Sequence, residues 1–555
     1  MDDRKIGIRF EVSDSGEFAF GWRSYADNGA QAKTVTSEVN ESGTPKEVKT
    51  YLKQRLTVNS LMGILRFGAV TAIYLFLYPF LLRSLGPAKF GLWALLCIPS
   101  QYLALGDLGI SNALIKLVSE SEPGKDRERL IRLTGAASII FTVLGALLTV
   151  LVVCLRGVIV RWLRISPELV SDAAMLLPGM AGVIWISLLG SVYTALLGGI
   201  QRTDWVHGIQ IGASVINAAG IVLTIKLGGG FGGLLLSNLL AALGTWLAAS
   251  LVARRSAGLG WLGWPRTNWN SLRSLLGFGG FLYIAALSSL LMEPSVKALL
   301  ARFGNLELVS YFEVASRIPL QARTLFANVL APLLPAASLL MVDRRTLQKL
   351  FSRTMKVLWL SAVPSFLLLA GLASPIIRVW VGKDLPMVAI AVSLLSLGWL
   401  FNVLTIPSYL FVQGLNEPRA AMICAFLQGA VCALGAYLLI PRWGLYGAVA
   451  SEFAGLLLGA IYIIRRLLAL CPMTIEEALG QRLSSAVLVS IAFMGCAFLA
   501  GRTIRVTSFI GLAALGATFL LSYVALAFFT ERGGVTLLEL MKEVLPTRKT
   551  LKISS

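Results

Sequence analysis

The residues of this sequence most able to do chemistry are ionisable side chains inside long apolar segments. In the segment 307–341, Glu313, Arg317 and Gln321 recur every four residues and therefore share one helical face, whereas Arg323 points elsewhere. At least one basic group of this segment is expected to face a cleft or a neighbouring helix. A charged stripe in a long apolar helix indicates a functional site.

Two further positions place charge inside apolar segments. Glu293 and Lys297 are four residues apart on one helical face and can pair, while Pro294 between them favours a kink and a hinge. A purely structural ion pair is the alternative. Arg66 lies about one turn inside the first apolar segment, where it can either extend to the surface or face a cavity.

Basic side chains around a cleft suit an anionic substrate, and arginine forks match phosphate or pyrophosphate. Acidic partners could take up protons or a cation and so couple transport to an ion gradient. Asp107 and Glu452 lie nearer the ends of their segments, where capping or packing explains them. His207 is expected to lie at an interface beside Asp204 and Trp205 rather than to act as a ligand.

The sequence contains few of the residues that metal sites and nucleophilic catalysis need. It contains one histidine, and its six cysteines form no CxxC pair, so metal sites and Ser-His or Cys-His catalysis are not expected. A GxxxxGK[ST] phosphate-binding loop is missing. We therefore expect neither a cofactor nor an enzymatic activity.

The composition identifies the elements that must position these charges. Of the 555 residues, 56% are hydrophobic and only 14% are charged, which predicts an all-α polytopic membrane protein. Hydropathy predicts about fourteen membrane-spanning helices. Their expected ranges are 61–82, 90–107, 133–155, 173–199, 206–226, 230–252, 277–302, 307–341, 355–377, 387–413, 419–440, 443–464, 484–501 and 505–530.

The formal net charge of +20 follows from basic loops between these helices. Lysine and arginine favour the cytoplasmic side, which predicts a multi-pass membrane protein with both termini in the cytoplasm. Basic flanks also favour contact with anionic membrane lipids, whereas nucleic-acid binding is not expected because the charge is scattered over short loops. Residues 1–56 are polar and are expected to form an unstructured extension, with a short hairpin pairing 6–12 with 18–22 as an alternative.

An internal repeat divides the apolar part of the chain. Residues 197–203 resemble residues 412–418, with Gly199 and Gly414 in register at a shift of 215 (414 − 199). Gly229 and Gly232 match Gly444 and Gly447 at the same shift. Each copy holds six predicted helices, an even number, so the two copies are expected to enter the membrane in the same direction and to enclose a central cleft.

Three motifs resemble the polysaccharide flippase family of the multidrug, oligosaccharidyl-lipid and polysaccharide exporter superfamily. They are LRSLGPAKFGLW (82–93), LGDLGISNAL (105–114) and YFEVASRIP (311–319). The resemblance implies alternating access and movement of an undecaprenyl-diphosphate-linked oligosaccharide from the inner to the outer leaflet of the bacterial cytoplasmic membrane. It also implies a cationic cavity, with Arg66, Lys297, Arg317 and Arg323 as candidates. Glu293, Pro294, Glu313 and Asp107 are the candidates for coupling or gating, although Glu293 with Pro294 departs from the aspartate and basic residue that such proteins often place there.

The expected organisation combines the repeat with this resemblance. We expect a cytoplasmic extension (1–56), two six-helix lobes (57–255 and 277–466) joined by a linker (256–276), an extra helix pair (467–530) and a basic tail (531–555). Proton or sodium coupling and contact with polysaccharide polymerase or assembly proteins are further expectations. The alternatives are a cation-coupled drug or metabolite antiporter of the same superfamily and a membrane glycosyltransferase or polymerase.

Overall fold

The structure is a computed structural model that divides into two units, Met1–Thr57 and Val58–Ser555. It describes residues 11–12, 18–19, 45–96, 107, 109–121, 127–257, 267–276, 288, 290–339, 344–471 and much of 492–530. In the first unit, strands β1 (Glu11–Val12) and β2 (Phe18–Ala19) pair antiparallel, with Val12 opposite Phe18. The alternative hairpin of the sequence analysis is therefore present in a short form.

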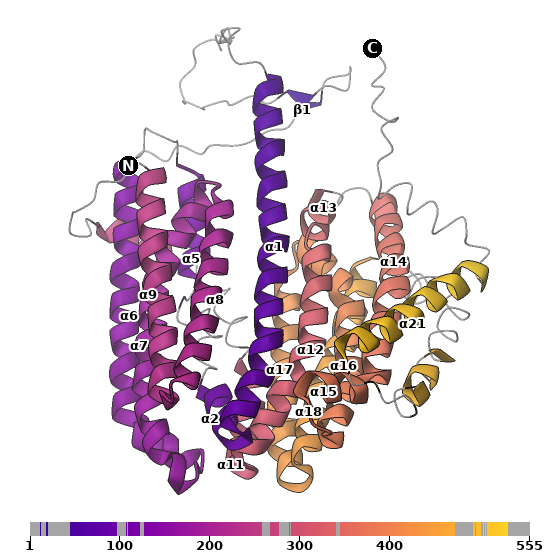
Figure 1. The fold of residues 1–555 in the computed structure, drawn as a ribbon. Helices are drawn as coiled ribbons and strands as arrows, with labels where there is room; N and C mark the ends of the chain where they lie inside the picture. Colours follow the sequence, from indigo (N-terminus) through magenta and orange to yellow (C-terminus); the bar gives the residue numbers. More distant parts are fainter. Residues whose placement is uncertain are drawn as a thin grey trace, which may run out of the picture. The chain divides into compact units, whose positions relative to one another are not determined.

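Helices form nearly all of the rest of the described chain (Figure 1). The first half contains α1 (Pro45–Leu85), α2 (Pro87–Leu96), α5 (Ile110–Ser119), α6 (Arg127–Trp162), the short η1 (Pro167–Leu169), α7 (Val170–Gly199), α8 (Thr203–Lys226) and α9 (Gly230–Ser256). The second half contains α11 (Glu293–Phe303), α12 (Leu306–Leu330), α13 (Leu333–Leu339), α14 (Arg344–Gly371), α15 (Ala373–Val381), α16 (Pro386–Gly414), α17 (Pro418–Trp443), α18 (Leu445–Leu470) and α21 (Phe509–Thr530).

Within the described residues, nine helices are long and apolar enough to cross a membrane, compared with about fourteen expected. The chain is a multi-pass membrane protein. Parts of the predicted helices 90–107, 277–302 and 484–501, and the basic tail, lie outside the described residues. The membrane span predicted to begin at residue 61 does begin at Leu61. The helix α1 itself already begins at Pro45, within the extension predicted to be unstructured, because the polar residues there are also good helix formers.

The two halves repeat one packing scheme. In the first, α6 and α9 pack on α7, and α8 packs on α9; in the second, α14 and α18 pack on α16, and α17 packs on α18. Both α8/α9 and α17/α18 cross closely at a glycine: a Cβ at Gly220 would lie 2.9 Å from Ser237 Oγ, and one at Gly435 would lie 2.9 Å from Ser451 Cβ. These two glycines are again 215 positions apart (435 − 220).

The turns after α7 and α16 confirm the register of the repeat in backbone detail. Gln201 and Asn416 both have a left-handed backbone, with φ of 62° and 64°. In each turn the next amide bonds back to the carbonyl five residues earlier, from Arg202 to Leu197 at 2.8 Å and from Glu417 to Val412 at 3.2 Å. This is the Schellman helix end, formed twice without glycine at its left-handed position.

Three predicted helices differ from the structure at or beside a proline. The segment 307–341 is broken between α12 and α13, where Pro332 cannot donate the backbone hydrogen bond that a continuous helix needs. The segment 355–377 is broken at Leu372, between α14 and α15. The segment 277–302 is interrupted by a turn at residues 291–292, directly before Pro294, which lies in the first turn of α11.

Contacts between the two halves gather near one end of their helices. Arg83 Nε at the end of α1 donates to the Val381 carbonyl of α15 at 2.6 Å. Arg302 at the end of α11 donates to the Trp162 carbonyl of α6 at 2.8 Å and lies 4.9 Å from the centre of the Trp162 ring. Gly91 of α2 packs so closely on α12 that a Cβ there would overlap the Leu306 carbonyl oxygen, at 1.7 Å. These contacts hold the halves together at that end.

Candidate functional site

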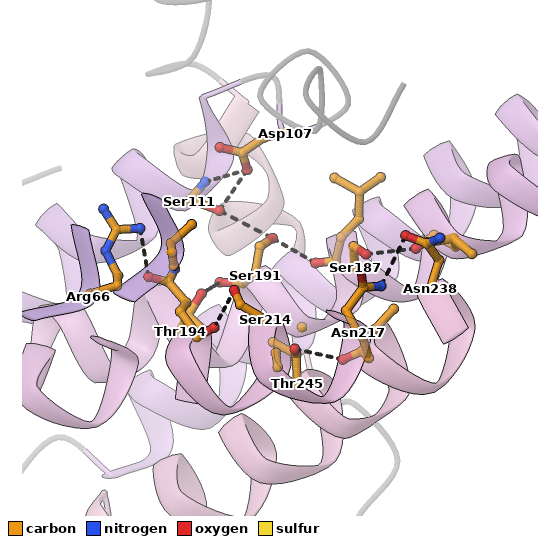
Figure 2. Close-up of a pocket in the computed structure, with 18 of the residues that line it drawn as sticks. Arg66, Asp107, Ser111, Ser187, Ser191, Thr194, Ser214, Asn217, Asn238 and Thr245 are labelled. Carbon is orange, nitrogen blue, oxygen red and sulfur yellow. Dashed lines mark hydrogen bonds between the residues drawn. The ribbon is translucent and has the colours of Figure 1, made fainter. Parts of the chain in front are cut away.

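A polar cavity of about 600 Å³ lies within the first half of the chain (Figure 2). It is bounded by α1, the start of α5, and α7, α8 and α9. Serine, threonine, asparagine and glutamine side chains dominate its polar lining, together with one arginine and one aspartate. These polar residues are Arg66, Asp107, Ser111, Ser187, Ser191, Thr194, Gln210, Ser214, Asn217, Asn238 and Thr245.

Helical spacing brings these side chains to one space. Ser187, Ser191 and Thr194 follow each other by four and three residues on α7, so they share the face that lines the cavity. Their hydroxyls donate to backbone carbonyls of their own helix, at 2.7 Å for Ser187 and Ser191 and 3.1 Å for Thr194. Each hydroxyl proton is therefore used in a hydrogen bond to a carbonyl of its own helix. The remaining oxygen lone pairs can accept hydrogen bonds from a ligand.

The same arrangement recurs on α8 and α9. Ser214 and Thr245 also donate to carbonyls of their own helices, both at 2.8 Å. Asn217 Nδ2 donates to Asn238 Oδ1 at 3.2 Å, and Asn238 Nδ2 donates to the Leu234 carbonyl at 2.8 Å. The cavity wall is therefore rich in acceptors, which suits a ligand that carries many hydroxyl donors.

Arg66 supplies the positive charge of this cavity. Its Nη1 donates to Gln210 Oε1 at 3.1 Å, and within the described part of the chain its buried Nε has no hydrogen-bond partner. The guanidinium thus keeps unused donors beside the hydroxyl-lined wall. An oxyanion such as a phosphate group is the ligand that these donors fit.

Asp107 lies at the cavity edge as part of the helix start. Its Oδ1 accepts from the Ser111 amide at 2.9 Å and from the Ser111 hydroxyl at 2.7 Å, inside the first turn of α5. A carboxylate is favourable at a helix N-terminus because the first amides lack helical partners. Asp107 therefore has a capping contact, and it lines the cavity as well.

The other charged candidates form a separate buried cluster. Lys297 of α11 contacts the carboxylates of both Glu293 and Glu313, and Arg317 contacts Glu313. Lys297 is 1% exposed and Glu313 is 2% exposed. The guanidinium carbon of Arg317 lies 4.9 Å from the centre of the Tyr78 ring of α1. The predicted pairing of Glu293 with Lys297 is confirmed, and in this conformation Lys297 and Arg317 contact carboxylates.

Arg323 occupies a third environment. Its Nε donates to Asn402 Oδ1 at 3.2 Å, and its guanidinium carbon lies 5.7 Å from the centre of the Trp399 ring. Of the four basic candidates, Arg66 alone lines the described cavity. Among the described residues, no group of three or more metal-ligating side chains comes together.

The polar lining was not predicted from the sequence, because uncharged hydroxyl and amide residues stand out less in apolar segments than charged residues do. The signal was nevertheless present in the spacing of hydroxyl and amide residues: Ser187, Ser191 and Thr194 on one helix, and Asn238 seven residues before Thr245 on another. Such residues are common in membrane helices, where they bond their own backbone. Only the convergence of three helices shows that they line one space.

Comparison with known proteins finds similar chains that are named as transport proteins. A curated relative, the putative O-antigen transporter of Shigella flexneri, is 20% identical over 414 residues, which cover 73% of this chain and 96% of that protein. The solved structure of the lipid II flippase MurJ in an inward closed conformation has a TM-score of 0.67 at 16% identity and covers 84% of this chain and 98% of its own.

A second solved structure gives the same fold. The inward-facing conformation of a multidrug resistance MATE family transporter of the MOP superfamily has a TM-score of 0.63 at 15% identity, covering 74% of this chain and 99% of its own. The resemblance stated from the three motifs is therefore confirmed for family and fold. Residues 80–389, more than half of the sequence, match the family described as "Polysaccharide biosynthesis protein", and the chain belongs to that family.

Proposed function

We propose that the chain is a transporter that flips a polyprenyl-diphosphate-linked oligosaccharide across the bacterial cytoplasmic membrane for surface polysaccharide biosynthesis, with no catalytic step. The observation that carries the proposal is the acceptor-rich cavity with Arg66 at its edge. A glycan offers many hydroxyl donors and its diphosphate offers oxyanions, so one cavity holds complementary partners for both parts. The family and the names of the relatives support the same conclusion.

Two subsites follow from the chemistry of the wall. The glycan lies against α7, α8 and α9, where Ser187, Ser191 and Asn217 accept hydrogen bonds from sugar hydroxyls. Arg66 binds the diphosphate at the α1 side. Neutral hydrogen bonds contribute about 0.5–1.5 kcal/mol each and those to charged groups about 1.5–3 kcal/mol, so Arg66 makes the largest single contribution.

Alternating access follows from the contacts at one helix end. With both termini in the cytoplasm, as the basic loops favour, Arg83, Trp162 and Arg302 lie toward the outer side. In this conformation their contacts close the outer end. We propose that the lipid-linked glycan enters from the inner leaflet, and that separation of these contacts opens the outer side.

The domain organisation is part of this proposal. The lobes 57–255 and 277–466 move against each other about the linker 256–276, with the helix pair 467–530 outside the repeat and cytoplasmic segments at 1–56 and 531–555. Lys297, Arg317 and Arg323 become accessible to the diphosphate only when their present partners separate. Glu293, Pro294 and Glu313 are the gating groups of that rearrangement. Partner proteins are the polymerase and assembly machinery of the same glycan.

The test uses the purified chain in lipid vesicles. The probe is a fluorescent undecaprenyl-diphosphate oligosaccharide of neutral hexoses, and exposure of its glycan at the opposite leaflet is followed with a membrane-impermeant quencher. We expect Arg66→Gln to slow flipping about tenfold, which corresponds to about 1.4 kcal/mol. The matched control is Arg255→Gln, an exposed arginine at the end of α9, which is expected to flip at the wild-type rate.

A second pair of variants separates the two subsites. Replacing both Asn217 and Asn238 with leucine is expected to slow flipping of the oligosaccharide probe but not of undecaprenyl diphosphate without a glycan. Arg66→Gln should slow both. Equal rates for Arg66→Gln and wild type would contradict the proposal. Cation-driven efflux of a dye such as ethidium, with no flipping of either lipid, would favour the antiporter instead.

A further inference from the structure

Glu452 of α18 is a buried carboxyl group that the proposed substrate path does not use. Its side chain is 2% exposed, and within the described part of the chain its Oε2 has no hydrogen-bond partner. An ionised carboxylate in such a place carries a desolvation cost of several kcal/mol unless a cation or several donors compensate it. The surroundings of Glu452 therefore decide its protonation state.

The nearest ionisable neighbours are already occupied. Glu452 is close enough to Glu293 and Lys297 of α11 to interact electrostatically with both. Lys297 contacts the carboxylates of Glu293 and Glu313, and Arg317 contacts Glu313. The cluster thus holds two cations against two carboxylates. An ionised Glu452 would add a third carboxylate and leave one buried negative charge uncompensated.

The other helices packed on α18 do not supply the missing charge. These helices are α11, α12, α16 and α17. From α16, the Trp399 indole lies beside Glu452, and from α17 the Cys432 thiol does. The remaining cation of α12, Arg323, donates to Asn402 and lies over the Trp399 ring. The cation that interacts electrostatically with Glu452 is Lys297, and it already contacts the carboxylates of Glu293 and Glu313.

We propose that Glu452 carries an exchangeable proton in this conformation and is the proton-binding site that couples transport to a proton gradient, an inference whose transport part rests on the function proposed above. With the proton bound, the cluster of Glu293, Lys297, Glu313, Arg317 and Glu452 is neutral. When the lobes separate and water reaches α18, the carboxyl group ionises and its proton passes to water. Rebinding of a proton from the other side restores the neutral, closed cluster.

The cluster has a physical connection to the cavity through α1. Arg317 lies over the Tyr78 ring, and the Tyr78 and Tyr74 ring centres are 5.9 Å apart on successive turns of α1. Tyr74 lines the cavity, and Arg66 is two turns away from it on the same helix. The charge of the cluster therefore acts on α1, because Arg317 lies over Tyr78. The occupancy of the cavity acts on the same helix, because Tyr74 and Arg66 line the cavity.

The direct test detects the proton rather than the transport. The full chain in lipid nanodiscs near neutral pH is expected to show an infrared C=O band of a protonated carboxylic acid that shifts in D₂O. Glu452→Gln should remove this band, and Glu452→Asp should retain it at a changed position. The matched control is Glu168→Gln, an exposed carboxylate in η1, which should leave the band unchanged. A band that persists unchanged in Glu452→Gln would overturn the proposal, as would a wild-type chain without the band.

The transport arm uses the vesicle assay with an imposed pH gradient. The gradient is expected to raise the wild-type flipping rate, and the ratio of rates with and without the gradient should fall to one in Glu452→Gln. Glu168→Gln should keep the wild-type ratio. A wild-type ratio of one, or a response only to a sodium gradient, would refute coupling through this proton. If the infrared band behaves as expected but no lipid is flipped, the flippase function fails while the proton site stands.

Discussion

Removing the carboxylate of Glu313 tests the account of the buried cluster most sharply. This side chain is 2% exposed and contacts both Lys297 and Arg317. Glu313→Gln keeps the shape and removes the charge. Lys297 still contacts Glu293, but Arg317 loses its ion pair with Glu313. Breaking a buried ion pair by removing one partner costs about 3–5 kcal/mol.

We expect the lower end of this range, about 3 kcal/mol, because Arg317 retains its contact with the Tyr78 ring. The assay is reversible unfolding by SDS in mixed micelles, followed by tryptophan fluorescence. The matched control is Glu307→Gln in the first turn of the same helix, an exposed residue whose carboxylate accepts from the Tyr311 hydroxyl at 2.5 Å. Its loss should cost no more than about 1 kcal/mol.

A double-variant cycle separates charge from packing. Arg317→Gln combined with Glu313→Gln removes one cation and one anion together, so the double variant should be more stable than the sum of the single losses predicts, by at least about 1 kcal/mol. Additive losses would refute the reasoning. So would a Glu313→Gln chain that unfolds within about 0.5 kcal/mol of Glu307→Gln.

Three other predictions concern the contacts between the two halves and the two-subsite cavity. Gly91→Ala should destabilise the chain by about 3 kcal/mol in the SDS assay, because the new Cβ would overlap the Leu306 carbonyl oxygen, whereas Gly212→Ala, with open space around it, should not. Arg302→Ala should weaken the helix end proposed above to be closed on the outer side, so that a cysteine placed at Ser187 in a cysteine-free background reacts faster with a membrane-impermeant thiol reagent from outside. An unchanged rate would place the closure elsewhere. When the oligosaccharide-linked lipid diphosphate and the glycan-free lipid diphosphate compete for flipping, the Asn217→Ala chain should prefer the oligosaccharide-linked lipid less strongly than the wild type does. An unchanged preference would remove this residue from the glycan subsite.

The sequence predicted the elements and the repeat because both depend on local patterns. Apolar length defines a membrane helix, and the pair of turns at Gln201 and Asn416 follows from similar short segments. Helix breaks were harder to predict. Pro332 lies at the break between α12 and α13, whereas Pro319 lies inside α12, so the presence of a proline alone did not predict where a helix ends.

The site was predicted only in part, for a physical reason. Helical periodicity showed that Glu313 and Arg317 share a face, and they do pair. It could not show that Lys297 arrives from another helix to contact the same carboxylate. Nor could it bring Ser187, Asn217 and Asn238 to one wall, because that convergence is a property of helix packing across long sequence distances.

The paired left-handed turns at Gln201 and Asn416 have an evolutionary consequence. The shared backbone geometry is what duplication of an ancestral half-length gene would leave, although the side chains around it now differ between the two halves. One descendant half has accumulated hydroxyls and amides around a hollow, while the other has accumulated opposite charges in a closed interior. Under the function and the proton site proposed above, this specialisation lets mutation alter the substrate cavity in one half without disturbing the proton site in the other.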